Sequence, residues 1–534
     1  MYNEFKTATH MSDQCLTKGI CSTNTTQSSI NEIILLYLKE LAFYVLRLKN
    51  LGITNEAVKK VFIDDLFNTI ACSEFNQEQF SAMMTKLYEY INQSKFLYEK
   101  VCNERNLPVE TNKSYFKYSK KFDLTDAIRK GEKYYIKKMQ SYSSLQSSLY
   151  DIMLFIAKSM DIKLVELERL GKTYEEAYYT ILTLFDKIRP RDCSNEEVKE
   201  IILEAVQVYY KLVREVYYAL EESYGKSEVS EISFSTQPGK AILVSGADFK
   251  KLEYVLEATK DSGVNVYTHG REMIGAHSYP KLKAYPNLKG HFGISLDGSL
   301  VDFASFPGAI LMTKGTLQSV EYLYRGRLFT MDPIPPSGVI KIKDNNFEQL
   351  VSSALNAKGF VKSTTRPSYR VGFNRQEIYD KAQKVIEKYM AKEIRHIYVI
   401  GLLNFPVPKV EYFDDFLNSV PDDCYVFSLA HKKSGPNIFH LESYYDYSLL
   451  YGILNTFEKS IPVSSINMTV FLYNCDKHTI SNLLYLKKKG VKSVFMPKCP
   501  PTLVSPLIMN TMQDEFNIME VSTPNADLEK TLST

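Results

Sequence analysis

The chain has 534 residues, 45% hydrophobic and 24% charged, which is enough for several domains and unlike the composition of a disordered protein. Its 65 lysines and arginines against 62 acidic residues leave a net charge of +3, so no nucleic acid or anionic membrane is expected as a partner. Eight scattered cysteines without a CxxC pair, and no apolar run of roughly 18 residues, predict a cytoplasmic protein with reduced thiols and no membrane span.

Residues 1–235 predict a helical domain, with an N-terminal segment followed by helical bundles. Apolar residues recur there at helical spacing, and several segments carry a capping-box pattern in which Ser or Thr precedes Glu by three positions. Three such patterns predict helix starts, namely Ser29 with Glu32, Thr173 with Glu176, and Ser194 with Glu197. The first of these helices should end near Gly52, and the third should run to Gly225.

Beyond residue 235 the pattern changes to short β-rich runs separated by helical stretches, which predicts parallel sheets with crossover helices. The predicted strands cover residues 241–244, 264–267, 309–312, 397–400, 425–429 and 468–472. A helix over residues 375–390 leads into the last α/β unit, so the predicted domains are 236–375 and 376–534. The fold class is therefore an α/β multidomain protein with N-terminal helical bundles.

One segment has an unusual sequence, Val266-Tyr-Thr-His-Gly-Arg-Glu-Met-Ile-Gly-Ala-His277, followed by Ser278-Tyr-Pro-Lys-Leu-Lys. It resembles a signature of the hybrid-cluster proteins, the hydroxylamine reductases or prismane proteins. Further segments match that family in type and order, namely 306–313, 325–330, 371–374, 490–494 and 522–524. The resemblance implies helical bundles followed by two Rossmann-like α/β domains around a buried cluster.

The family binds iron and sulfur through two sets of ligands, and this sequence departs from both. In the N-terminal set of four cysteines, Asn3 and Lys6 stand in two positions, while Cys15 and Cys21 remain. In the set for the hybrid cluster, the positions of the ligand histidine, two glutamates and four cysteines are occupied by Ala247, Glu272, Thr316, Leu403, His431, Tyr444 and Asp476. An alanine cannot ligate a metal, and thiolates are seldom replaced by harder ligands in such clusters.

From this comparison we expect no cofactor and no iron–sulfur cluster, and we predict a pseudoenzyme that keeps the scaffold to bind a protein partner or to form a homodimer. The alternative is a metal-dependent oxidoreductase with a remodelled site, related to hydroxylamine or nitric oxide detoxification. Glu272, His431 and Asp476 would then hold a single iron, manganese or zinc ion, unless they only satisfy one another by hydrogen bonds. His269 and His277 are expected to pack or hydrogen bond and not to ligate.

Overall fold

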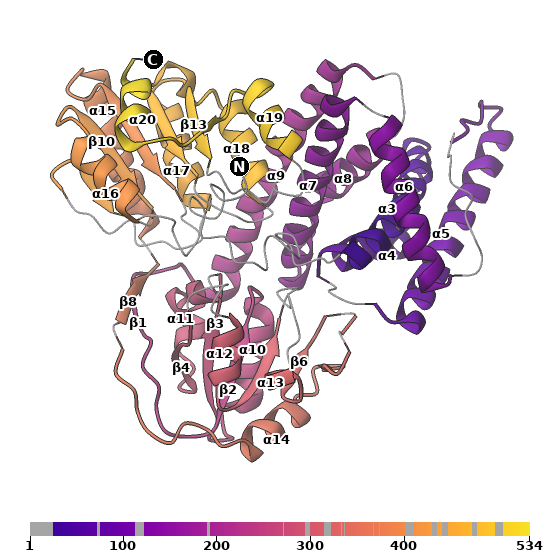
Figure 1. Cartoon of the computed structure of the whole chain (residues 1–534), viewed down its shortest axis with the longest axis horizontal. Coiled ribbons are helices and arrows are strands. Elements are labelled where there is room, and N and C mark those ends of the chain that lie inside the picture. The colour runs from indigo at the N-terminus through magenta and orange to yellow at the C-terminus, as the bar shows by residue number, and fades with distance from the viewer. Residues whose placement is uncertain are drawn as a thin grey trace.

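The computed structural model describes residues 25–533 with a set of internal gaps. The gaps are 72–74, 113–121, 142, 189–192, 271, 294–298, 314–321, 333, 336, 367, 373, 402–409, 430–434, 441–446, 473–477 and 497–505. Three parts can be followed in Figure 1, a helical part and two units that each contain a sheet. Of the helices within the described ranges, none is long and apolar enough to cross a membrane.

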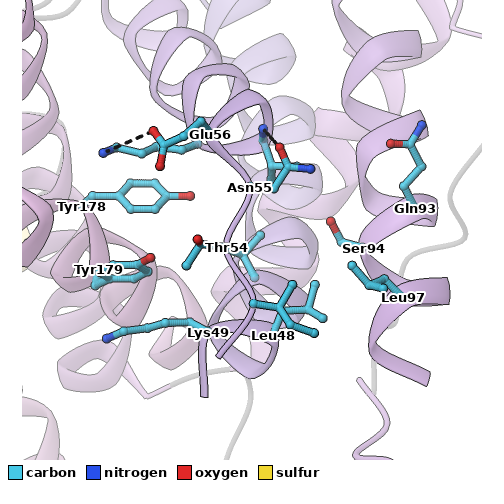
Figure 2. Close-up of a pocket in the computed structure, with 14 residues that line it drawn as sticks. Leu48, Lys49, Thr54, Asn55, Glu56, Gln93, Ser94, Leu97, Tyr178 and Tyr179 are labelled. Carbon is cyan, nitrogen blue, oxygen red and sulfur yellow. Dashed lines mark hydrogen bonds and ion pairs between the residues drawn. The ribbon is translucent and has the colours of Figure 1, made fainter. Parts of the chain in front are cut away.

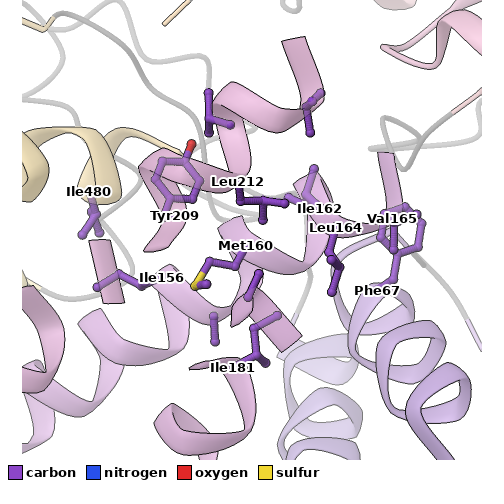
Figure 3. Packing of buried hydrophobic residues seen from close by; sticks show 14 of the residues in the cluster. Phe67, Ile156, Met160, Ile162, Leu164, Val165, Ile181, Tyr209, Leu212 and Ile480 are labelled. Carbon is purple, nitrogen blue, oxygen red and sulfur yellow. The ribbon is translucent and has the colours of Figure 1, made fainter. Parts of the chain in front are cut away.

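The helical part contains seven α-helices among the described residues. They are α3 (Thr25–Asn50), α4 (Glu56–Ala71), α5 (Gln77–Glu104), α6 (Leu124–Ser141), α7 (Ser144–Arg169), α8 (Glu175–Lys187) and α9 (Asn195–Tyr224). Helix α7 lies at the centre, packed against α4, α8 and α9 and against helices of the last unit. In Figure 3, the apolar side chains of Ile156, Met160 and Leu164 project from α7 among the neighbouring helices, as expected for a helix that is buried on several sides.

The capping patterns were partly correct. Helix α9 begins after Ser194 with the full capping box, in which Ser194 and Glu197 bond each other's backbone N–H, and it ends at Gly225 with φ 87°. The predicted start at Ser29 is wrong, because α3 begins at Thr25 and Ser29 lies inside it. The start at Thr173 is displaced as well, since the residue before α8 is Tyr174, which makes no side-chain cap.

The first α/β unit is built on a six-stranded parallel sheet in the order β4-β3-β2-β5-β6-β7. Its strands are β2 (Ala241–Ser245), β3 (Asn265–His269), β4 (Leu288–His291), β5 (Ala309–Met312), β6 (Leu328–Thr330) and β7 (Ile340–Lys341). Its helices are α10 (Phe249–Thr259), η1 (Met273–Ser278), α11 (Pro280–Lys283), α12 (Ser299–Ser305), α13 (Tyr322–Arg325) and α14 (Glu348–Asn356). The central strands β2, β3 and β5 are almost entirely buried, as expected for a sheet covered on both faces.

The second α/β unit repeats this topology in the order β11-β10-β9-β12-β13-β14. Its strands are β9 (His396–Ile400), β10 (Cys424–Ser428), β11 (Ile438–His440), β12 (Met468–Phe471), β13 (Ser493–Met496) and β14 (Met519–Glu520). Its helices are α15 (Arg375–Met390), α16 (Val410–Ser419), α17 (Tyr447–Glu458), η2 (Val463–Ser465), α18 (Thr479–Lys488), α19 (Pro506–Asp514) and α20 (Pro524–Leu532). In both sheets the first strand lies in the middle and the order reverses beside it, which is the doubly wound arrangement.

Two features connect the three parts. A two-stranded sheet pairs β1 (Ser230–Ser233) with β8 (Ser368–Val371), so the chain enters and leaves the first α/β unit at adjacent places. Helix α9 contacts α17 and α18 of the last unit and α11 of the first unit, and Figure 1 shows it running between them. The α/β fold class with helical bundles is confirmed, and the domain boundaries at 235 and 375 stay predictions.

Candidate functional site

The carboxyl ends of the central strands of the first sheet are the expected location of a binding site. In a doubly wound sheet, ligands bind in the crevice where the strand order reverses, which here lies between β2 and β5. Strand β2 ends at Ser245 and leads through Gly246 and Ala247 into α10, and strand β5 is followed by Thr313. The position that the family resemblance assigns to a ligand histidine is therefore at this crevice.

The loop between β2 and α10 is held by hydrogen bonds to Thr313. The Thr313 hydroxyl donates to the Ser245 carbonyl over 2.9 Å and accepts from the Asp248 N–H over 3.4 Å. The Asp248 side chain caps α10 by accepting from the Lys251 N–H over 3.1 Å. Ala247 lies within this closed loop with only 6% of its surface exposed.

The charges around the loop are compensated by one another. Arg169, at the end of α7, pairs with Asp248 over 2.7 Å. The buried Lys251 ammonium donates to the Thr313 carbonyl over 2.6 Å and lies 3.2 Å from the Asp332 carboxylate. Because each buried charge has a partner, this network holds the helical part against the first sheet. Removing one of its members would leave a buried charge without its partner.

A second hydrogen-bonded chain runs from β2 through β3 to α12. The Ser245 hydroxyl lies 2.8 Å from Nδ1 of His269, and Nε2 of His269 lies 3.2 Å from the Asp302 carboxylate. His269 is 3% exposed, whereas the Asp302 side chain is 21% exposed. Gly293 backs onto the pair, because a Cβ there would overlap the Asp302 carboxylate. The chain therefore leads from a partly exposed carboxylate to a hydroxyl at the crevice, an arrangement that can pass a proton.

Two further histidines are joined through Thr268. Its hydroxyl lies 2.8 Å from Nε2 of His277 and 2.8 Å from Nδ1 of His291. Burial lowers the pKa of His277 to about 4 and lowers that of His291 well below its ordinary value, so both rings are neutral at pH 7. The prediction that His269 and His277 make hydrogen bonds is confirmed.

The metal residues expected from the sequence are only partly within the described structure. Glu272 precedes η1 and is half-buried, in the turn that follows β3. His431 and Asp476 lie outside the described residues, as do Thr316, Leu403 and Tyr444. Within the described ranges, no three His, Cys, Asp or Glu side chains gather as metal ligands. The metal site of Glu272, His431 and Asp476 stays a prediction.

Comparison with known proteins shows where this fold belongs. The model of the Prismane/CO dehydrogenase family matches residues 11–439, which is most of the chain. The chain belongs to this family. It is 26% identical to the hydroxylamine reductase of Maridesulfovibrio salexigens, with 97% of each chain covered, and 27% identical to that of Rhodospirillum rubrum, with 96% of each covered. A solved carbon monoxide dehydrogenase from Thermococcus sp. AM4 is similar with a TM-score of 0.49 and 11% identity, covering 97% of this chain and 86% of the other.

Membership in the Prismane family corrects the expectation that the protein has no cofactor and that an iron–sulfur cluster is unfavoured. The hydroxylamine reductases and CO dehydrogenases of this family are iron–sulfur proteins, so membership points to a cofactor. The reasoning from sequence treated an incomplete set of family ligands as an empty site. That step is wrong, because a metal centre can be held by a different set of side chains.

One described residue, Ala247, does not fit the ligand set that the resemblance implies. Ala247 has a methyl group where the family has an imidazole, and it is enclosed by a loop whose hydrogen bonds are already made. The cysteines described with their surroundings, Cys102, Cys193 and Cys424, lie in α5, before α9 and in β10, so none of them belongs to that loop. At Ala247, therefore, no side chain is available to replace the ligand histidine that the resemblance implies.

The chain of Ser245, His269 and Asp302 was missed by reasoning from sequence. His269 lies in the recognised signature, but the ring was assigned a general packing or hydrogen-bonding role. Its partners come from β2 and α12, 24 residues before it and 33 residues after it. Only the register of β2 against β3, which pairs Ser245 with His269, could have indicated the first contact.

Proposed function

We propose that this protein uses the Prismane scaffold to bind a protein partner or a second copy of itself, and that it does not reduce hydroxylamine by the mechanism of its relatives. The observation that carries the proposal is Ala247, a buried methyl group at the crevice position of a family ligand. A methyl group neither ligates iron nor transfers a proton. We place the protein in the cytoplasm, because its scattered cysteines are typical of a reducing compartment.

The intact surroundings of Ala247 support a retained role. Arg169, Asp248, Lys251 and Asp332 are paired with one another, and they join the helical part to the first sheet. Removing one member of such a buried network is costly, so the network fixes how the helical part sits on the first sheet. A binding protein needs this shape and does not need the ligand set.

The test compares activity directly. The full chain, purified without oxygen, and the hydroxylamine reductase of Maridesulfovibrio salexigens are assayed for hydroxylamine-dependent oxidation of a reduced viologen dye. We expect no rate above that of a heat-treated sample, while the relative turns over. A rate within about tenfold of the relative's, a difference of only 1.4 kcal/mol in barrier, would contradict the proposal. Light scattering tests self-association, for which the mass of a dimer is expected; a monomer would exclude a homodimer.

A second candidate is a metal-dependent oxidoreductase with a remodelled site. It is favoured by the family's cofactors and by the chain from Asp302 through His269 to Ser245, which could deliver protons to a reduction at the crevice. Glu272, His431 and Asp476 would hold one iron, manganese or zinc ion. Elemental analysis should then find one metal per chain, and His431→Ala should lose it without unfolding. A metal retained in full by His431→Ala would exclude this ligand set.

A further inference from the structure

A cavity in the helical part lies apart from both sheets. It has a volume of about 170 Å³ and is formed by the end of α3, the α3–α4 turn and parts of α4, α5 and α8. Figure 2 shows Tyr178 and Tyr179 on one side, Ser94 and Leu97 on the other, and Thr54 between them. The turn is fixed by Gly52 at φ 82° and by Asn55, whose side chain accepts from the N–H of Ala57 over 2.9 Å.

Seven of the 14 residues that line the cavity are aliphatic or aromatic, and apolar atoms supply most of its surface. The aliphatic part consists of Val45, Leu48, Ile53, Val58 and Leu97. The rings of Tyr178 and Tyr179 are 5.1 Å apart at an angle of 57°, so they offer two differently tilted faces. Aromatic ligands gain stabilisation from such faces beyond the area that they bury.

One polar atom in this cavity lacks a partner. The Tyr178 side chain is 2% exposed, and its hydroxyl has no hydrogen-bond partner among the described residues. Burial raises the pKa of Tyr178, so the hydroxyl stays neutral. A buried hydroxyl without a hydrogen bond is unfavourable by about 1–3 kcal/mol, which a ligand with one polar group would relieve.

The charges at the cavity favour a neutral ligand over an anionic one, because the lysines already have partners. Lys59 is nearly buried and pairs with Glu175 and, over 3.9 Å, with Glu56. Lys49 lies over the Tyr179 ring at 4.0 Å from its centroid. Both carboxylates therefore pair with Lys59, and Lys49 lies against an aromatic face. Counted with Glu175, which does not line the cavity, these four charges sum to zero.

We propose that this cavity binds a small neutral aromatic molecule that carries one hydrogen-bonding group, with its ring against Tyr178 and Tyr179 and its polar group at the Tyr178 hydroxyl. A cavity of about 150 Å³ accepts a benzene ring, so the volume here suits one ring or two small fused rings. Indole has this size and a single N–H. The site is separate from the crevice of the first sheet, and its occupation does not depend on any metal.

Indole is also a convenient probe, because the chain contains no tryptophan and indole fluorescence can be excited apart from the 38 tyrosines. Titration of the full chain should give a saturable blue shift with one site per chain. Tyr178→Phe keeps the ring and removes only the unpartnered oxygen, so the variant should fold and bind indole about threefold to tenfold more weakly. Tyr218→Phe, at an exposed tyrosine of α9, serves as the matched control and should bind as the wild type does.

Two further measurements separate this site from non-specific uptake. Ser94→Leu fills the cavity at a buried position and should weaken indole binding by at least about tenfold. 1-Methylindole lacks the N–H, so Tyr178→Phe should bind it as tightly as the wild type does. Absence of a saturable shift, equal indole binding by wild type and Ser94→Leu, or equal loss of both ligands in Tyr178→Phe would overturn the proposal.

Discussion

Replacing Asp65 by asparagine should change how the stability of the helical part depends on pH. Asp65 lies in α4 and is 6% exposed, and its Oδ2 has no hydrogen-bond partner among the described residues. Burial, reinforced by the charge of the neighbouring Asp64, raises the pKa of Asp65 from 3.8 to about 8. In the folded protein this carboxyl is therefore protonated at neutral pH, whereas in the unfolded chain it is ionised.

The sign and size of the effect follow from this difference. Because the folded state holds a proton that the unfolded state releases above its pKa of 3.8, stability is lost as the pH rises from there to about 8. Each pH unit contributes about 1.4 kcal/mol, so about three units up to pH 7 correspond to about 4 kcal/mol. Asparagine has the same shape and does not ionise, so Asp65→Asn should be more stable than the wild type by an amount that grows between pH 5 and pH 8.

Amide hydrogen exchange in α4 measures this locally, which avoids treating a chain of several units as one transition. Wild type is compared with Asp65→Asn once at pH 5 and once at pH 8, both proteins being measured at the same pH each time. Glu56→Gln is the matched control, because Glu56 lies in the first turn of the same helix with its side chain 83% exposed. A difference between wild type and Asp65→Asn that is equal at both pH values would refute the reasoning.

Three other substitutions test the architecture. Gly131→Ala should destabilise the helical part by about 2 kcal/mol or more, since its Cβ would overlap the Ser29 carbonyl in the contact of α6 with α3; an unchanged Tm would contradict this packing. Ser194→Ala removes the cap of α9 and should lower the free energy of unfolding in urea by about 1 kcal/mol, whereas Ser194→Asp should retain most of it. Arg169→Met leaves the buried Asp248 carboxylate with only its longer contact to Lys251, over 3.8 Å, and should cost about 3 kcal/mol by urea unfolding, with the double variant that also carries Asp248→Asn recovering part of it.

The sequence predicted helices best where the start and stop signals came from the backbone itself. Ser194 and Gly225 were correct, because the capping box and a glycine with positive φ satisfy local requirements. Ser29 failed because a serine inside a buried helix looks the same in sequence as a cap, and its setting in α3 is decided by tertiary packing. The central strands were found from their apolar runs, while short edge strands such as β7 and β14 carry too few residues for a pattern.

For the candidate site, the sequence located the strand ends but not the contacts between them. The signature contains His269, which is the last residue of β3, and the family comparison placed Ala247 after β2. The link from His269 to Asp302 depends on how α12 returns over the sheet, which no local pattern encodes. Counting the family's ligand residues was also insufficient to exclude a cofactor, because other side chains could ligate a metal in their place.

Helix α9 bears on whether the two α/β units can exist as independent modules. Its 30 residues span about 45 Å. The N-terminal half of the helix contacts the second α/β unit, and its C-terminal end contacts the first. Lys199 pairs with Glu515 over 2.7 Å and Tyr209 stacks on His478, whereas Tyr224 packs against Phe249 and Tyr279. A fragment that contains only the last unit would expose the apolar faces of α17 and α18 that α9 covers. The protein should therefore resist being divided at the connection before β1, although the chain there looks like an ordinary linker between modules.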